Sequence, residues 1–224
     1  MTSSGLGSLL GMRHALEPDH LAAVSTLVSG ERSGYKAAFL GACWGLGHTF
    51  ALVAVGAVFV LLRAELPVRI SNLFEFGVAI MLVGLGVRAI YLAARQGPAG
   101  PTLAHHHGRT VHVHSGATGH IHIGAWTLAR RPLLVGAVHG LAGSGALTAL
   151  VLTTLPTTAA RLTYMALFGL GSTLGMAALS GLLGWPLARM GNHHAVARAV
   201  SLAVGLVSTT LGVYYGFTSP LLSN

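Results

Sequence analysis

The segment His14-Ala-Leu-Glu-Pro-Asp19-His20 combines two imidazoles, a carboxylate and a proline within a stretch that is otherwise small or apolar. Ionisable groups at membrane depth are costly, and they serve mainly to bind cations or to move protons. Pro18 has no amide proton to donate and clashes with the preceding turn, so we expect the helix to break or kink there. Secondary transporters build their midplane sites beside broken helices of this kind. The segment therefore predicts a metal site within a membrane transporter.

Two further histidines in apolar segments, His48 and His139, are candidate ligands. On an ideal helix His14 and His20 point about 120° apart, so only a break between them lets both face one ion. Imidazole suits nickel, cobalt, copper and zinc, and a carboxylate adds a harder, charge-neutralising donor. The alternative for a lone histidine in a hydrophobic helix is a hydrogen-bonding core residue. Four histidines together with an aspartate favour a metal site. Glu17 is a possible ligand, proton carrier or partner of Arg13.

The composition is that of a membrane protein. Charged residues make up 8% of the chain, against about 25% in soluble domains. Hydrophobic residues reach 53% and glycines number 31, which suits closely packed transmembrane helices. The net charge of +8 does not indicate nucleic-acid binding, because the basic residues lie mostly between apolar segments. The single cysteine, Cys43, excludes an intrachain disulfide and a dithiol redox relay.

Six segments reach the roughly 20 residues that a helix needs to cross the bilayer. They lie near residues 4–29, 35–62, 69–95, 131–155, 159–190 and 195–218, and the fifth is expected to end near Trp185-Pro186. Eight basic residues lie beside the connections after the first, third and fifth spans: Arg32, Lys36, Arg95, Arg109, Arg130, Arg131, Arg189 and Arg198. Only Arg63, Arg69 and Arg161 lie at the other side. The positive-inside rule then predicts that both termini are outside and that loop 96–130 is cytoplasmic.

The chain also repeats itself. Gly11-Met-Arg-His14-Ala-Leu recurs as Gly136-Ala-Val-His139-Gly-Leu, and Trp44-Gly-Leu-Gly-His48-Thr-Phe recurs as Phe168-Gly-Leu-Gly-Ser172-Thr-Leu. Three spans in each half require opposite orientations, so we expect two inverted three-helix repeats, residues 1–95 and 131–224, with the site where they meet. Chance similarity between glycine-rich and leucine-rich helices is the alternative. Spacings such as Gly136-x-x-x-Gly140 indicate close helix packing.

The loop at 96–130 carries seven of the thirteen histidines: His105, His106, His107, His112, His114, His120 and His122. The rest of the loop is rich in small residues, so we expect it to be flexible without metal. If His112-Val-His114 and His120-Ile-His122 are extended, each presents both rings on one side. The tract is interpreted as a cytoplasmic metal buffer or sensor, and the alternative is a linker that binds metal adventitiously. His193-His194 extends the same patch under the first interpretation.

The motif His-x-x-x-x-Asp-His at His14 to His20 resembles the signature of the nickel/cobalt transporter (NicO) family. Trp44-Gly-Leu-Gly-His48-Thr is similar to the family's second conserved stretch. The amino-acid sequences of residues 14–24 and 139–148 are most similar to those of the short, urease-accessory-like branch. The resemblance implies transport of Ni²⁺ or Co²⁺, with His14, Asp19, His20 and His48 as metal-handling residues.

The chain departs from that family's pattern in two respects. Better-known members have eight spans with the first motif in the second, whereas here the motif lies in the first. Their later motifs carry acidic residues, whereas residues 139–148 and 168–176 here have none. The second half therefore supplies His139 but no carboxylate.

The sequence predicts an all-α integral membrane protein of six helices in the cell (inner) membrane. Its expected function is transport of Ni²⁺ or Co²⁺ as substrate, with no permanently bound cofactor, through His14, Asp19, His20, His48 and His139. Transport requires neutral histidines, so it should weaken in acid. The alternatives are efflux on the same scaffold and an intramembrane iron enzyme with clustered histidine boxes. The expected partners are the lipid bilayer and the metal ion, not nucleic acid, and a soluble metallochaperone or a second copy of the chain is possible.

Overall fold

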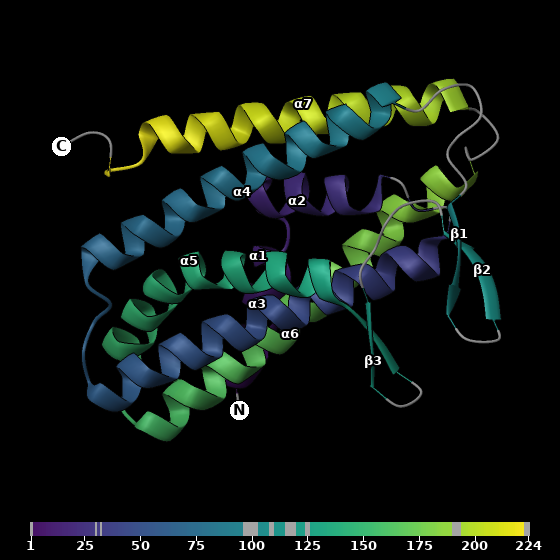
Figure 1. The fold of residues 1–224 in the computed structure, drawn as a ribbon. Helices are drawn as coiled ribbons and strands as arrows, with labels where there is room; N and C mark the ends of the chain where they lie inside the picture. Colours follow the sequence, from purple (N-terminus) through teal and green to yellow (C-terminus); the bar gives the residue numbers. More distant parts are fainter. Residues whose placement is uncertain are drawn as a thin grey trace.

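The computed structural model describes residues 2–29, 31, 33–95, 103–107, 110–114, 120–123, 126–189 and 194–221. Its helices are α1 (Thr2–His14), α2 (Pro18–Val28), α3 (Gly34–Leu62), α4 (Val68–Arg95), α5 (Arg130–Thr154), α6 (Thr158–Arg189) and α7 (His194–Thr218). The long helices run in roughly one direction across Figure 1, with the C-terminus at the left-hand end and the strands at the right. The loops that join α3 to α4 and α5 to α6 lie at the same end as the C-terminus.

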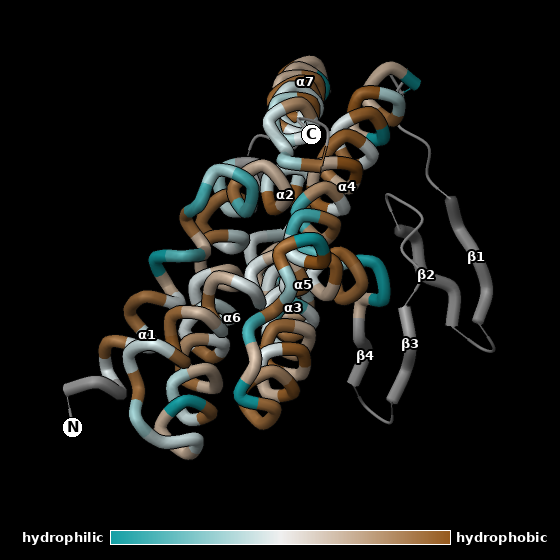
Figure 2. The backbone as a smooth tube through the Cα atoms, turned by 90° about the vertical axis from the view of Figure 1, so that its left-hand side faces the viewer, coloured by the Kyte–Doolittle hydropathy of each residue, from teal (hydrophilic) through white to brown (hydrophobic). Residues whose placement is uncertain are grey.

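Five helices are long and apolar enough to cross a membrane: Gly34–Leu62, Val68–Arg95, Arg130–Thr154, Thr158–Pro186 and Ala195–Thr218. Large hydrophobic side chains are exposed on their surfaces, for example Phe50, Leu182 and Phe217, at 76%, 72% and 79%. Figure 2 shows hydrophobic positions distributed along these helices rather than confined to one end. On helices of this length and composition, exposed apolar surface on this scale indicates contact with lipid. The protein is therefore a helical membrane protein, as its composition predicts.

The first predicted span is divided into two short helices. Helix α1 ends at His14 and α2 begins at Pro18, which confirms the predicted break. Neither piece alone reaches the length that a crossing requires, so a sixth crossing formed by the pair stays a prediction.

The fifth crossing segment ends at Pro186, near the predicted Trp185-Pro186. Helix α6 itself continues to Arg189, with Pro186 inside it. Proline already has a helical φ, and near a helix end it costs one backbone hydrogen bond without preventing a final turn.

The histidine-rich loop contains regular structure that the prediction of a flexible segment missed. Strands β1 (Leu103–His107) and β2 (Thr110–His114) form one antiparallel pair, and β3 (His120–Ile123) and β4 (Trp126–Ala129) form another. The alternation of Val or Ile with histidine has the two-residue period of a strand. The backbone is thus extended at His112–His114 and His120–His122, as the two-histidine interpretation requires, while the side chains of residues 103–128 lie outside the described part.

Helix α3 lies at the centre of the packing and contacts both α5 and α6 along its length. Helix α1 packs on α6, and α4 packs on α7. The sequence repeat pairs α1 and α2 with α5, α3 with α6, and α4 with α7. When each helix is exchanged for its repeat partner, every one of these contacts becomes a contact that the structure contains. Thus α1 on α6 corresponds to α5 on α3, and α2 on α7 corresponds to α5 on α4.

Glycines at corresponding sequence positions make corresponding contacts. A methyl group at Gly11 would collide with the carbonyl oxygen of Phe168, and a methyl group at Gly136 would collide with that of Trp44. These pairs are the ones that the sequence repeat aligns. Because only glycine allows backbones to approach so closely, the predicted close packing at Gly136 and Gly140 is confirmed.

The contact between α3 and α6 shows the same correspondence. Thr49 Oγ1 lies 2.8 Å from Thr173 Oγ1, and it donates to the carbonyl oxygen of Gly169 at 2.7 Å. Gly169 packs against the Thr49 side chain, and Gly45 packs against Thr173. The two central helices are therefore joined by a hydroxyl pair between residues at matching positions.

Candidate metal centre

The break between α1 and α2 is a short turn held by two backbone hydrogen bonds. Leu16 N–H donates to Arg13 O at 2.9 Å, and Glu17 N–H donates to His14 O at 3.1 Å. Glu17 has extended backbone angles (φ −64°, ψ 147°), which is the conformation that a following proline favours. The helix cannot continue through this point, and α2 begins at Pro18.

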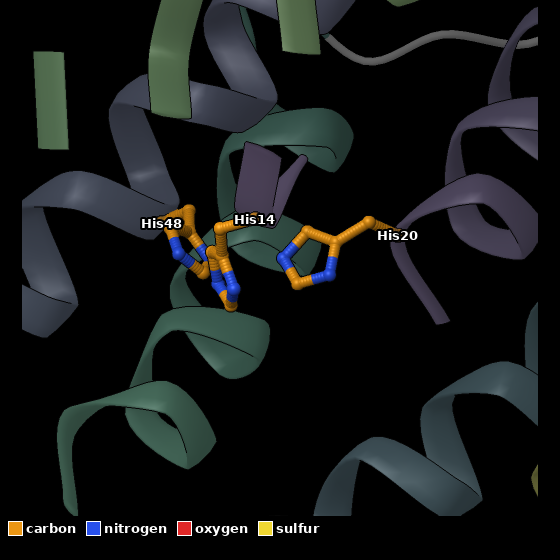
Figure 3. A group of neighbouring side chains, drawn as sticks. All are labelled: His14, His20 and His48. Carbon is orange, nitrogen blue, oxygen red and sulfur yellow. The ribbon is translucent and has the colours of Figure 1, made fainter. Parts of the chain in front are cut away.

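Three histidines from three helices meet at this break. His14 at the end of α1, His20 in α2 and His48 in α3 point toward one another (Figure 3). Their ring centroids are 4.4 Å (His14–His20), 5.3 Å (His14–His48) and 5.2 Å (His20–His48) apart. One ring nitrogen from each lies within 4.8 Å of the others. Imidazole nitrogens at this separation can be drawn onto one metal ion by small side-chain movements.

The fourth histidine joins the cluster from the second half of the chain. The His139 ring in α5 lies 4.0 Å from the His20 ring and 5.9 Å from the His48 ring, centroid to centroid. Asp19 connects these residues: its Oδ2 lies 2.7 Å from His139 Nε2, and its Oδ1 lies 3.1 Å from His20 Nδ1. Asp19, His20 and His139 form a second group with metal-ligand spacing, and it shares His20 with the first.

The cluster is buried, and several of its nitrogens are unpartnered. His20, His48 and His139 are 1%, 0% and 2% exposed. Within the described residues, no hydrogen-bond partner exists for five nitrogens: His14 Nε2, His20 Nε2, both His48 nitrogens and His139 Nδ1. Buried polar atoms are nearly always paired, and each exception needs an explanation. Donor atoms left without partners around one point are what a cation-binding site provides.

Glu17 lies at the edge of this centre. Its Oε1 is 2.9 Å from His14 Nδ1, and its side chain is 53% exposed. The contact orients the His14 ring so that its other nitrogen faces the cluster. Among the described residues, Glu17 therefore contacts a candidate ligand histidine rather than Arg13.

Sequence reasoning missed two aromatic neighbours of the centre. The Trp44 ring lies 5.5 Å from His20 and 5.8 Å from His139, and Phe168 lies 5.3 Å from His14. Trp44 is fully buried and its indole N–H is unpartnered among the described residues. The available signal was the spacing, because Trp44 precedes His48 by four residues and therefore lies on the same helix face.

The structure brings together the five predicted metal residues, His14, Asp19, His20, His48 and His139. It does not describe the side chains of the loop histidines, which belong to strands β1, β2 and β3: His105, His106, His107, His112, His114, His120 and His122. His193 and the His194 side chain also lie outside the described residues.

Comparison with known proteins identifies the family. The chain is 33% identical over 210 residues to the urease accessory protein UreH of Bacillus sp. (strain TB-90), and the match covers 94% of this chain and 88% of that protein. The chain belongs to the UreH family. The UreH relative is an accessory protein and not itself an enzyme, so the alternative of an intramembrane iron enzyme loses its support.

Two plant relatives of the UreH-family chain are more distant. Chloroplast proteins FOR GROWTH AND FERTILITY 1 and FOR GROWTH AND FERTILITY 2, both from Arabidopsis thaliana, are 28% and 27% identical over 189 residues. The matches cover 82% of this chain but only 50% and 47% of those proteins. No family model matches the chain, and no solved structure matches it.

Proposed function

We propose that the protein carries a divalent transition-metal ion, Ni²⁺ first and Co²⁺ next, across the membrane through the cluster of His14, Asp19, His20, His48 and His139. The observation that carries this proposal is the convergence of four imidazoles and one carboxylate, with unpartnered nitrogens, inside a helical membrane protein. The ion is the transported substrate. No resident cofactor is part of the proposal.

The chemistry of the donor set favours a borderline transition metal. Neutral imidazole suits nickel, cobalt, copper and zinc, whereas magnesium and calcium prefer sites built of oxygen ligands. Asp19 neutralises part of the ion's charge in a place where lipid and apolar side chains supply none. Its contacts with His20 and His139 also hold those rings in position before the ion arrives.

Family membership supports nickel within that group. The UreH relative is named for its accessory role toward urease, and handling of nickel for that enzyme accounts for a nickel-binding cluster in a membrane protein. The resemblance of the His14–His20 motif to the nickel/cobalt transporter family points to the same ion.

The cluster lies where the two halves of the chain meet. His14, Asp19, His20 and His48 belong to the first half, and His139 belongs to the second. The matched contacts of Gly11 and Gly136 support two inverted repeats, with the broken pair α1 and α2 as the sixth crossing. In the proposed cycle, the ion loses water at the cluster, and rocking of one half against the other exposes it to the opposite side.

The distribution of basic residues supports an orientation with both termini outside an inner membrane. The paired strands between α4 and α5 then lie in the cytoplasm. Seven histidines in that segment are proposed to buffer or sense the transported metal, and a soluble metallochaperone is their expected exchange partner. The bounds 1–95, 96–130 and 131–224 are the proposed first repeat, loop and second repeat.

The test is the metal content of cells measured by mass spectrometry after exposure to trace Ni, Co, Zn and Mn. Wild type is compared with His14→Ala and Asp19→Asn at matched expression, and Glu65→Gln serves as a control because Glu65 is an exposed carboxylate outside the cluster. Raised nickel or cobalt that both variants abolish supports import through this site. Lowered metal with wild type assigns efflux on the same scaffold. Unchanged metal with well-expressed wild type rejects the transport proposal.

A further inference from the structure

A cavity of about 240 Å³ lies beside the metal cluster. It is lined by residues of α2, α4, α5, α7 and the segment after α7, and its polar lining comprises Asp19, Glu75, Tyr215, Thr218 and Ser219. Six water molecules occupy roughly 180 Å³ in the liquid. The cavity is therefore large enough for a divalent ion that keeps its first shell of water.

Asp19 belongs to both the cavity and the cluster. It lines the cavity while its two oxygens contact His20 and His139. Its side chain is 18% exposed, whereas those of the two histidines are 1% and 2% exposed. A cation in the cavity thus meets Asp19 before it meets the unpartnered nitrogens of the buried rings.

Glu75 supplies the second carboxylate of the cavity. It lies in the third turn of α4 and is exposed, and no ion pair holds it within the described part of the chain. The positions of Thr218 and Ser219 at the end of α7 place the cavity near the end of the molecule that carries the C-terminus. In the orientation proposed above, that end faces the outside.

We propose that this cavity is the outward-facing vestibule for the hydrated ion, and that Glu75 captures the divalent cation and passes it to Asp19. The inference rests on the proposed function, since it assigns an entrance to the same site. Carboxylate and hydroxyl oxygens suit an ion that still carries water, and the imidazoles beyond Asp19 suit one that has lost it. A cleft lined with one sign of charge raises the local concentration of the opposite ion and its rate of entry.

The first experiment measures initial rates of nickel uptake against nickel concentration for wild type, Glu75→Gln, Glu75→Lys and Glu65→Gln. Glu65 provides the matched control because it lies in the loop before α4, at the same end of the molecule, and does not line the cavity. We expect Glu75→Gln to raise the half-saturating concentration threefold to tenfold, with a maximum rate within about twofold of wild type. Glu75→Lys should raise it further, and Glu65→Gln should leave it unchanged.

Ionic strength provides a readout that a merely structural role would not change. Charges are screened beyond about 30 Å at 0.01 M salt and beyond about 8 Å at 0.15 M. The ratio of half-saturating concentrations between Glu75→Gln and wild type should therefore fall at least twofold over that range. Equal values for the two proteins at low salt would overturn the capture role.

The second experiment tests the position and sidedness of the vestibule without relying on transport. Thr218→Cys is treated in intact cells with a membrane-impermeant, positively charged thiol reagent, against the background of the buried Cys43. We expect modification from outside, and at least a threefold slower reaction when nickel is present. Reaction only in inverted vesicles would overturn the outward orientation, and labelling that is indifferent to nickel would overturn the vestibule. Failure of wild type to change cellular metal would reject the proposed function itself, which is a separate outcome.

Discussion

His139 Nε2 lies 2.7 Å from Asp19 Oδ2, although the two residues are 120 positions apart in the chain. The contact joins α5 to the start of α2 and connects the two halves of the sequence at the metal cluster. Because the other Asp19 oxygen contacts His20, the carboxylate holds one ring from each half. The His20 Nε2 and His139 Nδ1 atoms remain without partners among the described residues while Asp19 makes both contacts.

Replacing Asp19 by asparagine should weaken nickel binding by about tenfold to 100-fold or more. Loss of a residue that only orients a metal ligand already lowers metal affinity by about that factor. Asparagine keeps the size of the side chain but loses its charge. Equilibrium dialysis of the purified protein in detergent measures the change, with Glu65→Gln as the control. Wild-type affinity in Asp19→Asn would remove Asp19 from the site.

Alanine at Gly136 should destabilise the helix packing, because its methyl group would collide with the backbone of Trp44. Overpacking of this kind costs about 1–3 kcal/mol. Gly84→Ala is the matched control, since no atom lies within 4 Å of the position that its methyl group would take. Thermal unfolding in detergent should show a lower midpoint for Gly136→Ala and no loss for Gly84→Ala. Equal midpoints would mean that the close approach is unimportant.

Transport should weaken as the pH falls from about 7.5 to about 5.5. Imidazole gains its positive charge between about pH 8 and pH 5, and only the neutral ring binds metal. Protons and nickel compete for the same imidazole nitrogens, and acid favours the protons. Initial uptake rates at subsaturating nickel check the direction, and a rate that stays constant over this interval would contradict histidine ligation.

Replacing the seven loop histidines by alanine should preserve transport, because they lie in strands β1, β2 and β3, whereas the cluster residues lie in α1, α2, α3 and α5. It should lower the number of nickel ions bound per purified protein. Dialysis with metal analysis measures that number. Loss of uptake with unchanged expression would show instead that the loop takes part in translocation.

Several features of the fold follow from local sequence. Pro18 breaks the first span because it lacks an amide proton, and the long apolar segments predict the five long helices. Helix α6 continues past the predicted end of the crossing to Arg189, because a proline near a helix end costs one backbone hydrogen bond without preventing a final turn. The strands in the loop were detectable only from the alternation of histidine with Val and Ile, a pattern that glycine and serine obscured.

The sequence by itself determined the chemistry of the candidate site: residue type and the broken helix at Glu17-Pro18 identified His14, Asp19 and His20 as residues that act together. The tertiary structure decided which distant residues join them. His48 and His139 are placed by glycine contacts between α3 and α5, where a collision at Gly136 or Gly140 would push the helices apart. Trp44 beside the rings, and Glu75 in a shared cavity with Asp19, likewise depend on how α3, α4 and α7 pack. Local spacing specifies a helix and its face, whereas the neighbour of that face is set by close packing between segments far apart in the chain.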